Sequence, residues 1–342
     1  MKRDKNTDYT ITDPEERREM ERAADGLAHV LRVGLLIGVG MVAVGVFLLL
    51  SACHKESADT AGGTAMVTVS TSLMDVSMDA IGGGQDDLSG DEGSGAAMGS
   101  PAKEAVADYN DIKAMTLAFF DAQGNEIYNT TQLRADNTTY TTFGEFGAEL
   151  PMGTYTMIAL GYGSEQPITL SSATEAVFTA DRVRETFVAT QTVEVTSTNP
   201  LSLSAELSRV VSKALVRSTD TRTAGVDSVR VTFAAGGRGM NPQTGLAVSN
   251  TGLVNTVGTT TAVGAASNTI SYLFLASDQQ SMTVTVEALR TDGTVYSSRT
   301  VANVPLRRNR VTVLRGPLYS NASGAGFTVS TAWGGDTTFV DF

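Results

Sequence analysis

Cys53 is the only cysteine of the chain, and His29 and His54 are its only histidines. A Ser-His-Asp triad or a Cys-His pair needs an imidazole as base, and zinc sites draw on the same side chains. Residues 55–342 contain neither residue type, so they hold none of these combinations. Paired carboxylates for glycoside hydrolysis need only Asp and Glu, but here these fall mostly in turns and on polar strand faces. We therefore expect a protein that is not an enzyme and that has no catalytic, metal-binding or cofactor-binding residues.

Cys53 is a candidate for lipid modification rather than catalysis. It follows Leu-Ser-Ala (residues 50–52) at the end of an uncharged run that begins at Val33. This order resembles the lipobox of bacterial lipoproteins. The resemblance implies that residues 1–52 are a lipoprotein signal peptide, although the run is longer than a usual h-region. It also implies that the Cys53 sulfur receives a diacylglyceryl group and that the new amine is acylated, for example with palmitate. A membrane-spanning helix is the alternative, since the run is near the lower length limit for a bilayer span.

Two or more acyl chains anchor a protein stably, so the lipid would hold residues 54–342 outside the cytoplasm, at the outer membrane or the cell surface. No cysteine remains after Cys53 to form an intramolecular disulfide, so stability must come from packing. The chain has a formal net charge of −12. That charge argues against nucleic acid and acidic lipid surfaces as partners.

The pattern after Cys53 is one of strands. Residues 53–63 are small and polar, as in a tether, and residues 66–71 alternate as a first strand. Residues 77–105 are rich in Gly, Asp and Ser, which predicts a disordered acidic loop. A calcium site in that loop is an alternative, but the spacing does not match an EF-hand; its carboxylates would be Asp86, Asp87, Asp91 and Glu92.

Strand signals become dense after the loop. Residues 112–120 are apolar on both faces, which predicts a strand inside a sandwich, followed by a turn at 121–125. Pro200 suggests a domain boundary, so we expect an N-terminal domain at 64–198 and a C-terminal domain at 199–342. Before Arg209 the apolar residues are at odd positions, and after it an apolar set at even positions begins with Val210. This change of alternation indicates a bulge where the strand passes from one sheet to another. Asp292-Gly293 predicts a hairpin. The sequence therefore predicts an all-β protein of two tandem β-sandwich domains.

Glycan binding is an alternative function, because sugar sites use exposed aromatic rings with a polar tip. Trp333 is the only tryptophan of the chain. At strand positions tyrosines belong more often to the core, so their part in such a site stays open; the candidates are Tyr128, Tyr140, Tyr155 and Tyr162.

Four further segments, in this order, carry a resemblance to a family. They are the apolar run ending in Phe-Asp-Ala-Gln-Gly at residues 112–124, Leu-Pro-Met-Gly-Thr-Tyr at 150–155, Leu-Ser-Arg-Val-Val-Ser-Lys at 207–213, and Asn-Arg-Val-Thr-Val-Leu-Arg-Gly at 309–316. Together with the lipobox they resemble the fimbrillin-like fimbrial subunits and anchors of the Bacteroidota. The similarity spans most of residues 64–333 and departs from the family in the loop 77–105.

The resemblance implies two transthyretin-like (Greek-key) sandwiches and a structural role in a fimbria, with other fimbrial subunits as partners. Stalk subunits of that family lose their first strand to an Arg-specific protease and accept a donor strand from the next subunit, which is β-augmentation. Here no arginine lies between Cys53 and Arg134, and a cut at Arg134 would remove residues 112–120 as well. We therefore expect a lipid-anchored anchor or assembly subunit that keeps its first strand, rather than a trimmed stalk or tip subunit.

Overall fold

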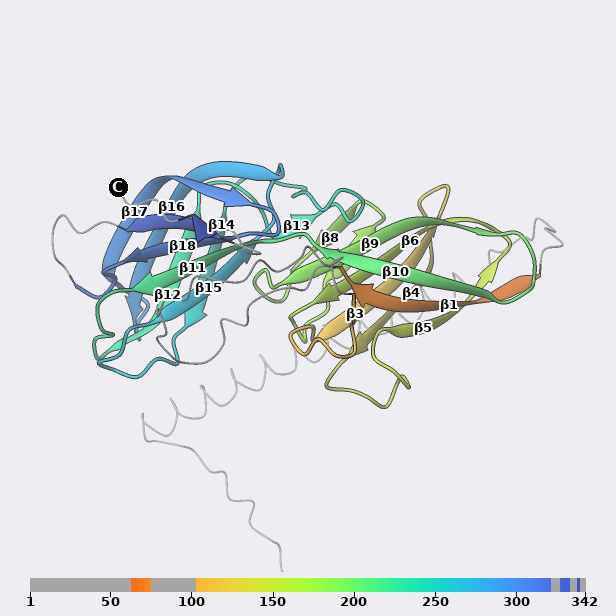
Figure 1. The fold of residues 1–342 in the computed structure, drawn as a ribbon, viewed down its shortest axis with the longest axis horizontal. Coiled ribbons are helices and arrows are strands. Elements are labelled where there is room, and N and C mark those ends of the chain that lie inside the picture. The colour runs from red at the N-terminus through yellow and green to blue at the C-terminus, as the bar shows by residue number, and fades with distance from the viewer. Residues whose placement is uncertain (1–62, 75–102, 321–326, 333–336, 339–342) are drawn as a thin grey trace, which may run out of the picture. The chain divides into compact units, whose positions relative to one another are not determined.

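The computed structural model describes residues 63–74, 103–320, 327–332 and 337–338. Every regular element in these ranges is a β-strand (Figure 1), so the predicted all-β fold is confirmed there. The same ranges contain no helix long and apolar enough to cross a membrane. Four predictions fall on residues outside them: the signal peptide 1–52, the lipid on Cys53, the tether 53–63 apart from Gly63, and nearly all of the acidic loop 77–105.

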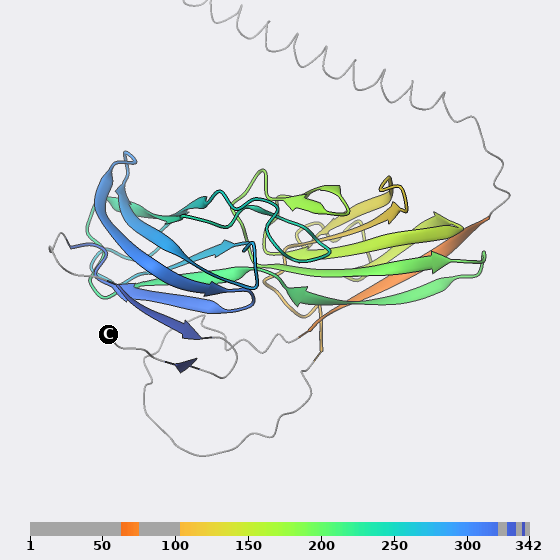
Figure 2. The same ribbon diagram turned by 90° about the horizontal axis from the view of Figure 1, so that it is seen from above.

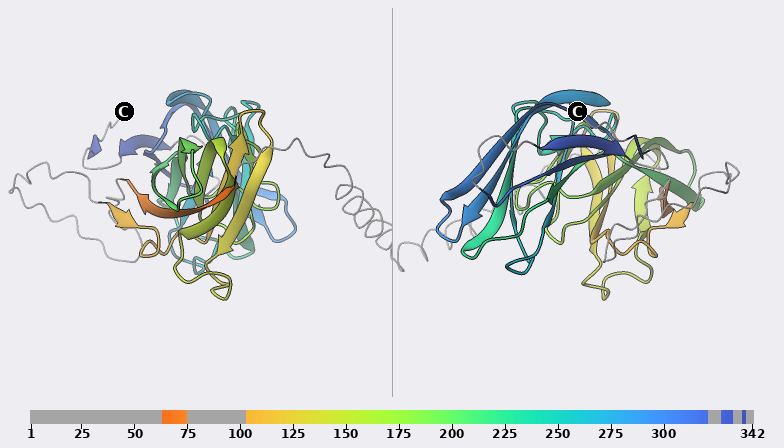
Figure 3. Two further views of the ribbon diagram at one scale, coloured as in Figure 1. Left: turned by 90° about the vertical axis from the view of Figure 1, so that its right-hand side faces the viewer. Right: turned by 60° about the vertical axis from the view of Figure 1, so that its left-hand side comes forward.

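Eight strands form the first sheet, in the hydrogen-bonded order β2-β1-β10-β9-β6-β3-β4, with β5 also paired to β1. Their bounds are β1 (Thr64–Leu73), β2 (Glu104–Ala105), β3 (Ala114–Asp121), β4 (Glu126–Leu133), β5 (Glu145–Pro151), β6 (Gly153–Tyr162), β9 (Thr186–Val195) and β10 (Leu201–Arg209). The sheet folds over along β10, whose first part pairs with β1 and whose last two residues pair with β9. The result is a sandwich whose two layers can be followed in Figure 3 (left).

Strand β1 shows how the sequence builds this sandwich. Successive side chains of a strand point to opposite faces, and the alternate residues Ala65, Val67, Val69 and Leu73 of β1 are all buried. They pack in one core with apolar residues of β3, β6 and β9. The residues between them are polar or exposed, so one face of β1 belongs to the core and the other to the surface.

Strand β3 is buried on both faces, as the apolar run at 112–120 predicts. It lies between β4 and β6. The apolar residues of one face lie in a cluster that also holds Leu170, Ala176 and Met240. These three come from a small sheet of β7 (Thr169–Ser172), β8 (Glu175–Val177) and β13 (Gly239–Met240). Phe178, directly after β8, contacts Tyr162 of β6 edge-on, with 6.0 Å between ring centroids.

The second sandwich consists of a five-stranded and a four-stranded sheet. The first sheet holds β11 (Ser212–Ser218), β15 (Asn268–Leu273), β18 (Val311–Gly316), β19 (Thr328–Ala332) and β20 (Thr337–Thr338). The other holds β12 (Val226–Phe233), β14 (Leu253–Gly258), β16 (Gln279–Arg290) and β17 (Val295–Arg307). The predicted Asp292-Gly293 hairpin is confirmed between β16 and β17, where Gly293 has a positive φ of 80°.

The predicted start of the second domain at residue 199 differs from the observed pairing. Strand β10 runs parallel to β1 for seven residue pairs, so it belongs to the first sandwich (Figure 2). The alternation within β10 reveals that it is a strand, but its partner lies more than 130 residues away in the sequence. The change of alternation after Arg209 does mark a change of sheet, because β11 begins at Ser212 in the second sandwich.

The two sandwiches share apolar contacts. One core cluster includes Phe120 and Ile158 of the first sandwich together with Val231 and Val286 of the second. The Phe178 and Phe274 rings stack with 6.3 Å between their centroids. The division into two domains therefore stays a prediction.

Alkaline pH is expected to destabilise the fold. Burial raises the pKa of five tyrosines above 10.0: Tyr109, Tyr155, Tyr162, Tyr272 and Tyr319. Above pH 10 the unfolded chain releases these protons while the folded chain keeps them, so stability is full below that pH and falls as the pH rises further. Burial also lowers the pKa of three basic groups, Lys213, Arg134 and Arg182, which acts in the opposite sense. These are three groups against five, and the two arginines start from 12.5, well above the tyrosines.

Urea unfolding from neutral pH to above pH 10, with phenolate absorbance as a second readout, tests this expectation. The midpoint should fall, and these phenolates should appear together with unfolding. Full ionisation of the tyrosines in a chain that stays folded would contradict it.

Candidate functional site

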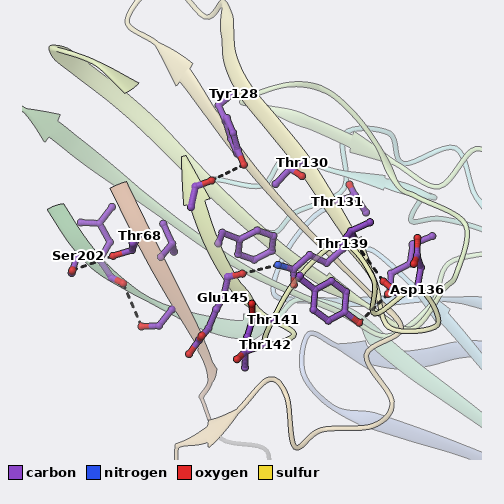
Figure 4. Close-up of a pocket in the computed structure, with 18 residues that line it drawn as sticks. Thr68, Tyr128, Thr130, Thr131, Asp136, Thr139, Thr141, Thr142, Glu145 and Ser202 are labelled. Carbon is purple, nitrogen blue, oxygen red and sulfur yellow. Dashed lines mark hydrogen bonds between the residues drawn. The ribbon is translucent and has the colours of Figure 1, made fainter. Parts of the chain in front are cut away.

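An open groove of about 880 Å³ crosses β5 in the first sandwich. Figure 4 shows Thr68 and Ser202 at one end, and Thr130, Asp136 and Thr139 at the other. The lining comes from β1, β4, β5, β10 and the segment 136–142 that precedes β5. Most side chains along it carry hydroxyl, amide or carboxylate groups, so the groove suits a polar ligand better than an apolar one.

Two of the tyrosines considered for a sugar platform, Tyr128 and Tyr140, line this groove together. The Tyr128 hydroxyl donates to the Gly147 carbonyl at 2.9 Å, and the Tyr140 hydroxyl donates to the Leu133 carbonyl at 3.1 Å. The Tyr140 ring also lies against Phe143, with 5.6 Å between centroids. These contacts hold both partly buried rings at the groove, so it has an aromatic as well as a polar lining.

The other candidate residues lie elsewhere. Tyr155 and Tyr162 are buried in the sandwich cores and do not line the groove. Trp333 and the four carboxylates of the acidic loop lie outside the described residues. Sequence reasoning missed the threonines of the groove, although the run Thr-Thr-Tyr-Thr-Thr at 138–142 was a visible signal. In the described part of the chain, no cluster of three or more His, Cys, Asp or Glu residues could hold a metal ion.

The Gln132 side chain, which lines the groove, hydrogen-bonds to backbone groups at the start of β5. Its amide nitrogen donates to the Glu145 carbonyl at 2.6 Å, and its amide oxygen accepts from the Gly144 nitrogen at 2.8 Å. The Gly144 carbonyl in turn accepts from the Thr71 hydroxyl at 2.7 Å. Gly144 has a positive φ of 88°, and a Cβ there would stand 2.6 Å from that hydroxyl oxygen. Only glycine fits this position without strain.

Replacing Gln132 by Leu is expected to destabilise the protein by about 2–4 kcal/mol, because two backbone groups lose their partners inside the fold. Gln132 is only 6% exposed, so water cannot easily replace the amide. Gln123→Leu, in the exposed turn after β3, is the matched control and should change stability by less than about 0.5 kcal/mol. Urea unfolding of both variants checks the difference, and equal effects would contradict the role of Gln132.

Strand β1 is the second functional candidate. It pairs with β10 from Val67 to Leu73 and with β5 from Thr64 to Ser70, so it fills the space between two other strands. Among the residues that the structure describes, the next strand after it is β2, which begins at Glu104. The place of β1 in the sheet thus depends on pairing with strands far along the chain.

Arg134, the first arginine after Cys53, is tied into the fold. Its guanidinium lies over the Phe143 ring, 4.1 Å from the centroid. It donates to four backbone carbonyls, those of Ile112 (2.7 Å), Val106 (2.9 Å), Ala107 (3.0 Å) and Tyr109 (3.0 Å). A protease that needs this side chain in its own pocket would have to break all of these contacts.

The family model of a family of unknown function, DUF6562, matches residues 165–340, just over half of the chain. The chain belongs to this family. A search of curated proteins found no match.

Three solved structures are similar to the chain at low identity. A candidate adhesin from Bacteroides ovatus is 9% identical with a TM-score of 0.46, covering 81% of this chain and 96% of that one. The fimbrial anchor protein Mfa2 from Porphyromonas gingivalis is 11% identical with a TM-score of 0.44, covering 80% and 98%. A candidate polysaccharide-binding protein from Bacteroides thetaiotaomicron is 12% identical with a TM-score of 0.42, covering 81% and 98%. At these values the likeness carries no conclusion about function.

Proposed function

We propose that the chain is a structural component of a cell-surface fimbria, held in the outer membrane by lipid on Cys53. In this role it is an anchor or assembly subunit that engages neighbouring subunits by β-strand complementation. It performs no catalysis.

The observation that carries the proposal is the position of β1. This strand adds backbone pairing on both sides and an apolar row to the core. Strand complementation uses the same two contributions, since main-chain hydrogen bonds give affinity and pockets for alternate side chains give register. A strand in this position can be supplied by its own chain or by another one.

Two features support retention of β1 in the mature protein. The sequence has no arginine between Cys53 and Arg134. The Arg134 side chain is engaged by four carbonyls and one ring, which disfavours cleavage there. A chain that keeps both its lipid and its first strand suits the base of a filament better than its stalk.

The N-terminus and intact mass of the protein, taken separately from outer membranes and from sheared filaments, test this role. We expect an acylated Cys53 with β1 retained, in the membrane fraction. A form trimmed between residues 77 and 106 in the filament fraction would instead identify a stalk or tip subunit. Cys53→Ala should release the protein from the membrane; full retention there would contradict the lipid anchor.

Surface glycan binding is a second candidate, favoured by one observation: Tyr128 and Tyr140 line the same polar groove. If neutral oligosaccharides bind there, Tyr140→Ala should weaken binding by roughly three- to tenfold. Tyr296→Ala, on β17 of the second sandwich, is the matched control and should bind normally. Equal binding by the wild type and both variants would exclude the groove as the sugar site.

A further inference from the structure

A second hollow, of about 460 Å³, is lined by three arginines. Arg182 and Arg184 reach it from the segment between β8 and β9, and Arg238 from the residues before β13. Thr256 of β14 and Asp181 also line it. Three guanidinium groups thus border one hollow with a single carboxylate, in a chain whose formal net charge is −12.

The carboxylate is already engaged by neighbouring groups. Asp181 accepts from the Ser164 hydroxyl at 2.9 Å, from Arg184 Nε at 2.8 Å and from the Arg182 backbone nitrogen at 2.7 Å. Burial acts to raise the pKa of Asp181, but the hydrogen bonds from Arg184 and Ser164 outweigh it and hold that pKa below its usual value. Asp181 therefore stays charged and pairs with Arg184. Its charge also attracts Arg182, but one carboxylate does not balance three cations, so positive charge is left over at the hollow.

Among the described residues, no ion pair or side-chain hydrogen bond involves the guanidinium of Arg182 or Arg238. Arg182 is partly buried, and burial together with repulsion from Arg184 lowers its pKa. Arg238 is exposed and also borders a neighbouring hollow that Glu175 lines. The backbone around Arg238 is fixed, because Gly239 pairs with Val177 and the Arg238 carbonyl accepts from the Phe178 nitrogen at 3.1 Å.

We propose that this hollow, the arginine pocket, binds an oxyanion group of a small acidic ligand: the carboxylate of an acidic sugar, or a sulfate or phosphate. Guanidinium groups present paired donors that match the oxygens of such groups. A volume of about 460 Å³ suits a ligand of monosaccharide size. An anion there would also relieve the repulsion between Arg182 and Arg184. The site is separate from β1 and from the groove on β5, so it does not depend on the proposed fimbrial role.

Titration calorimetry on the full chain tests the proposal with four probes: inorganic sulfate, inorganic phosphate, glucuronate and neutral glucose. We expect at least one anionic probe to bind while glucose does not. Tighter binding of glucuronate would identify an acidic sugar as the ligand class, and tighter binding of sulfate or phosphate would identify a free or esterified oxyanion. Binding should weaken as the salt concentration rises.

Arg238→Gln and Arg182→Gln should each weaken binding by about tenfold or more, because each removes a charge-assisted contact. Arg307→Gln, an exposed arginine at the end of β17, is the matched control and should bind like the wild type. Since Arg238 is exposed, its variant should fold normally, which thermal unfolding would verify. No binding of any anion, or equal loss in Arg307→Gln and the pocket variants, would overturn the proposal.

Discussion

Glu185→Gln is expected to lower the free energy of unfolding by about 3–5 kcal/mol, because it removes the charge from one partner of a buried ion pair. Glu185 Oε1 lies 2.7 Å from Arg209 Nε, and the two side chains are 8% and 2% exposed. The Tyr109 hydroxyl donates to the other Glu185 oxygen at 3.0 Å. The glutamine would keep the shape but leave the Arg209 charge buried beside a neutral group.

The contacts around Arg209 keep its side chain from moving to water when the Glu185 charge is removed. Its Nη1 donates to Asn309 Oδ1 at 3.1 Å, and its guanidinium lies 4.6 Å from the centroid of the Phe187 ring. Lys213, two residues into β11 and also buried, has its pKa lowered by burial. Glu185 thus offsets two buried cations at the point where the chain passes from one sandwich to the other, and neither cation can move to water without opening that junction.

Urea unfolding of Glu185→Gln checks the prediction. Glu194→Gln, an exposed position on the same strand β9, is the control and should change stability by less than about 0.5 kcal/mol. The double variant Glu185→Leu with Arg209→Met should lose less stability than Glu185→Gln, because only Lys213, and no longer Arg209, is left as a buried cation without Glu185. A single variant as stable as the control would show that the ion pair does not hold the junction.

Val67→Asp is expected to displace β1 from the first sandwich. Val67 is 0% exposed and lies opposite Leu201 of β10 and Ala148 of β5. A carboxylate there has no cationic partner among its pairing neighbours, and burying it would cost at least several kcal/mol. Detaching β1 from the sheet would cost less free energy than burying this carboxylate, so β1 would detach and leave β5 and β10 without their shared neighbour.

Hydrogen exchange of the β1, β5 and β10 amides measures this displacement. Met66→Asp is the matched control, since Met66 is the preceding residue on the opposite face and is 44% exposed. Its amide protection should stay close to that of the wild type. A peptide of residues 64–73 with the natural sequence should restore protection in Val67→Asp, as strand complementation requires. Protection unchanged in Val67→Asp would mean that β1 is not needed to close the sheet.

Much of the local structure could be predicted from the sequence, because strand alternation and turn chemistry depend on residues close together in the chain. The apolar run at 112–120 predicts the buried strand β3, and the turn at 121–125 is confirmed between β3 and β4, with Gly124 at a φ of 83°. The segment 150–155, which carries part of the family resemblance, spans the connection between β5 and β6.

Only the tertiary structure decided which strands pair and which side chains meet. The alternation in β10 is the same whether it pairs with β1 or starts a new domain, because pairing partners are set by the shape of the whole sheet. Tyr128 and Tyr140 come together because β4 and the segment before β5 border one groove. Arg238 joins Arg182 and Arg184 because β13 pairs with β8. Local pattern determines the elements, whereas contacts distant in the sequence determine the sites.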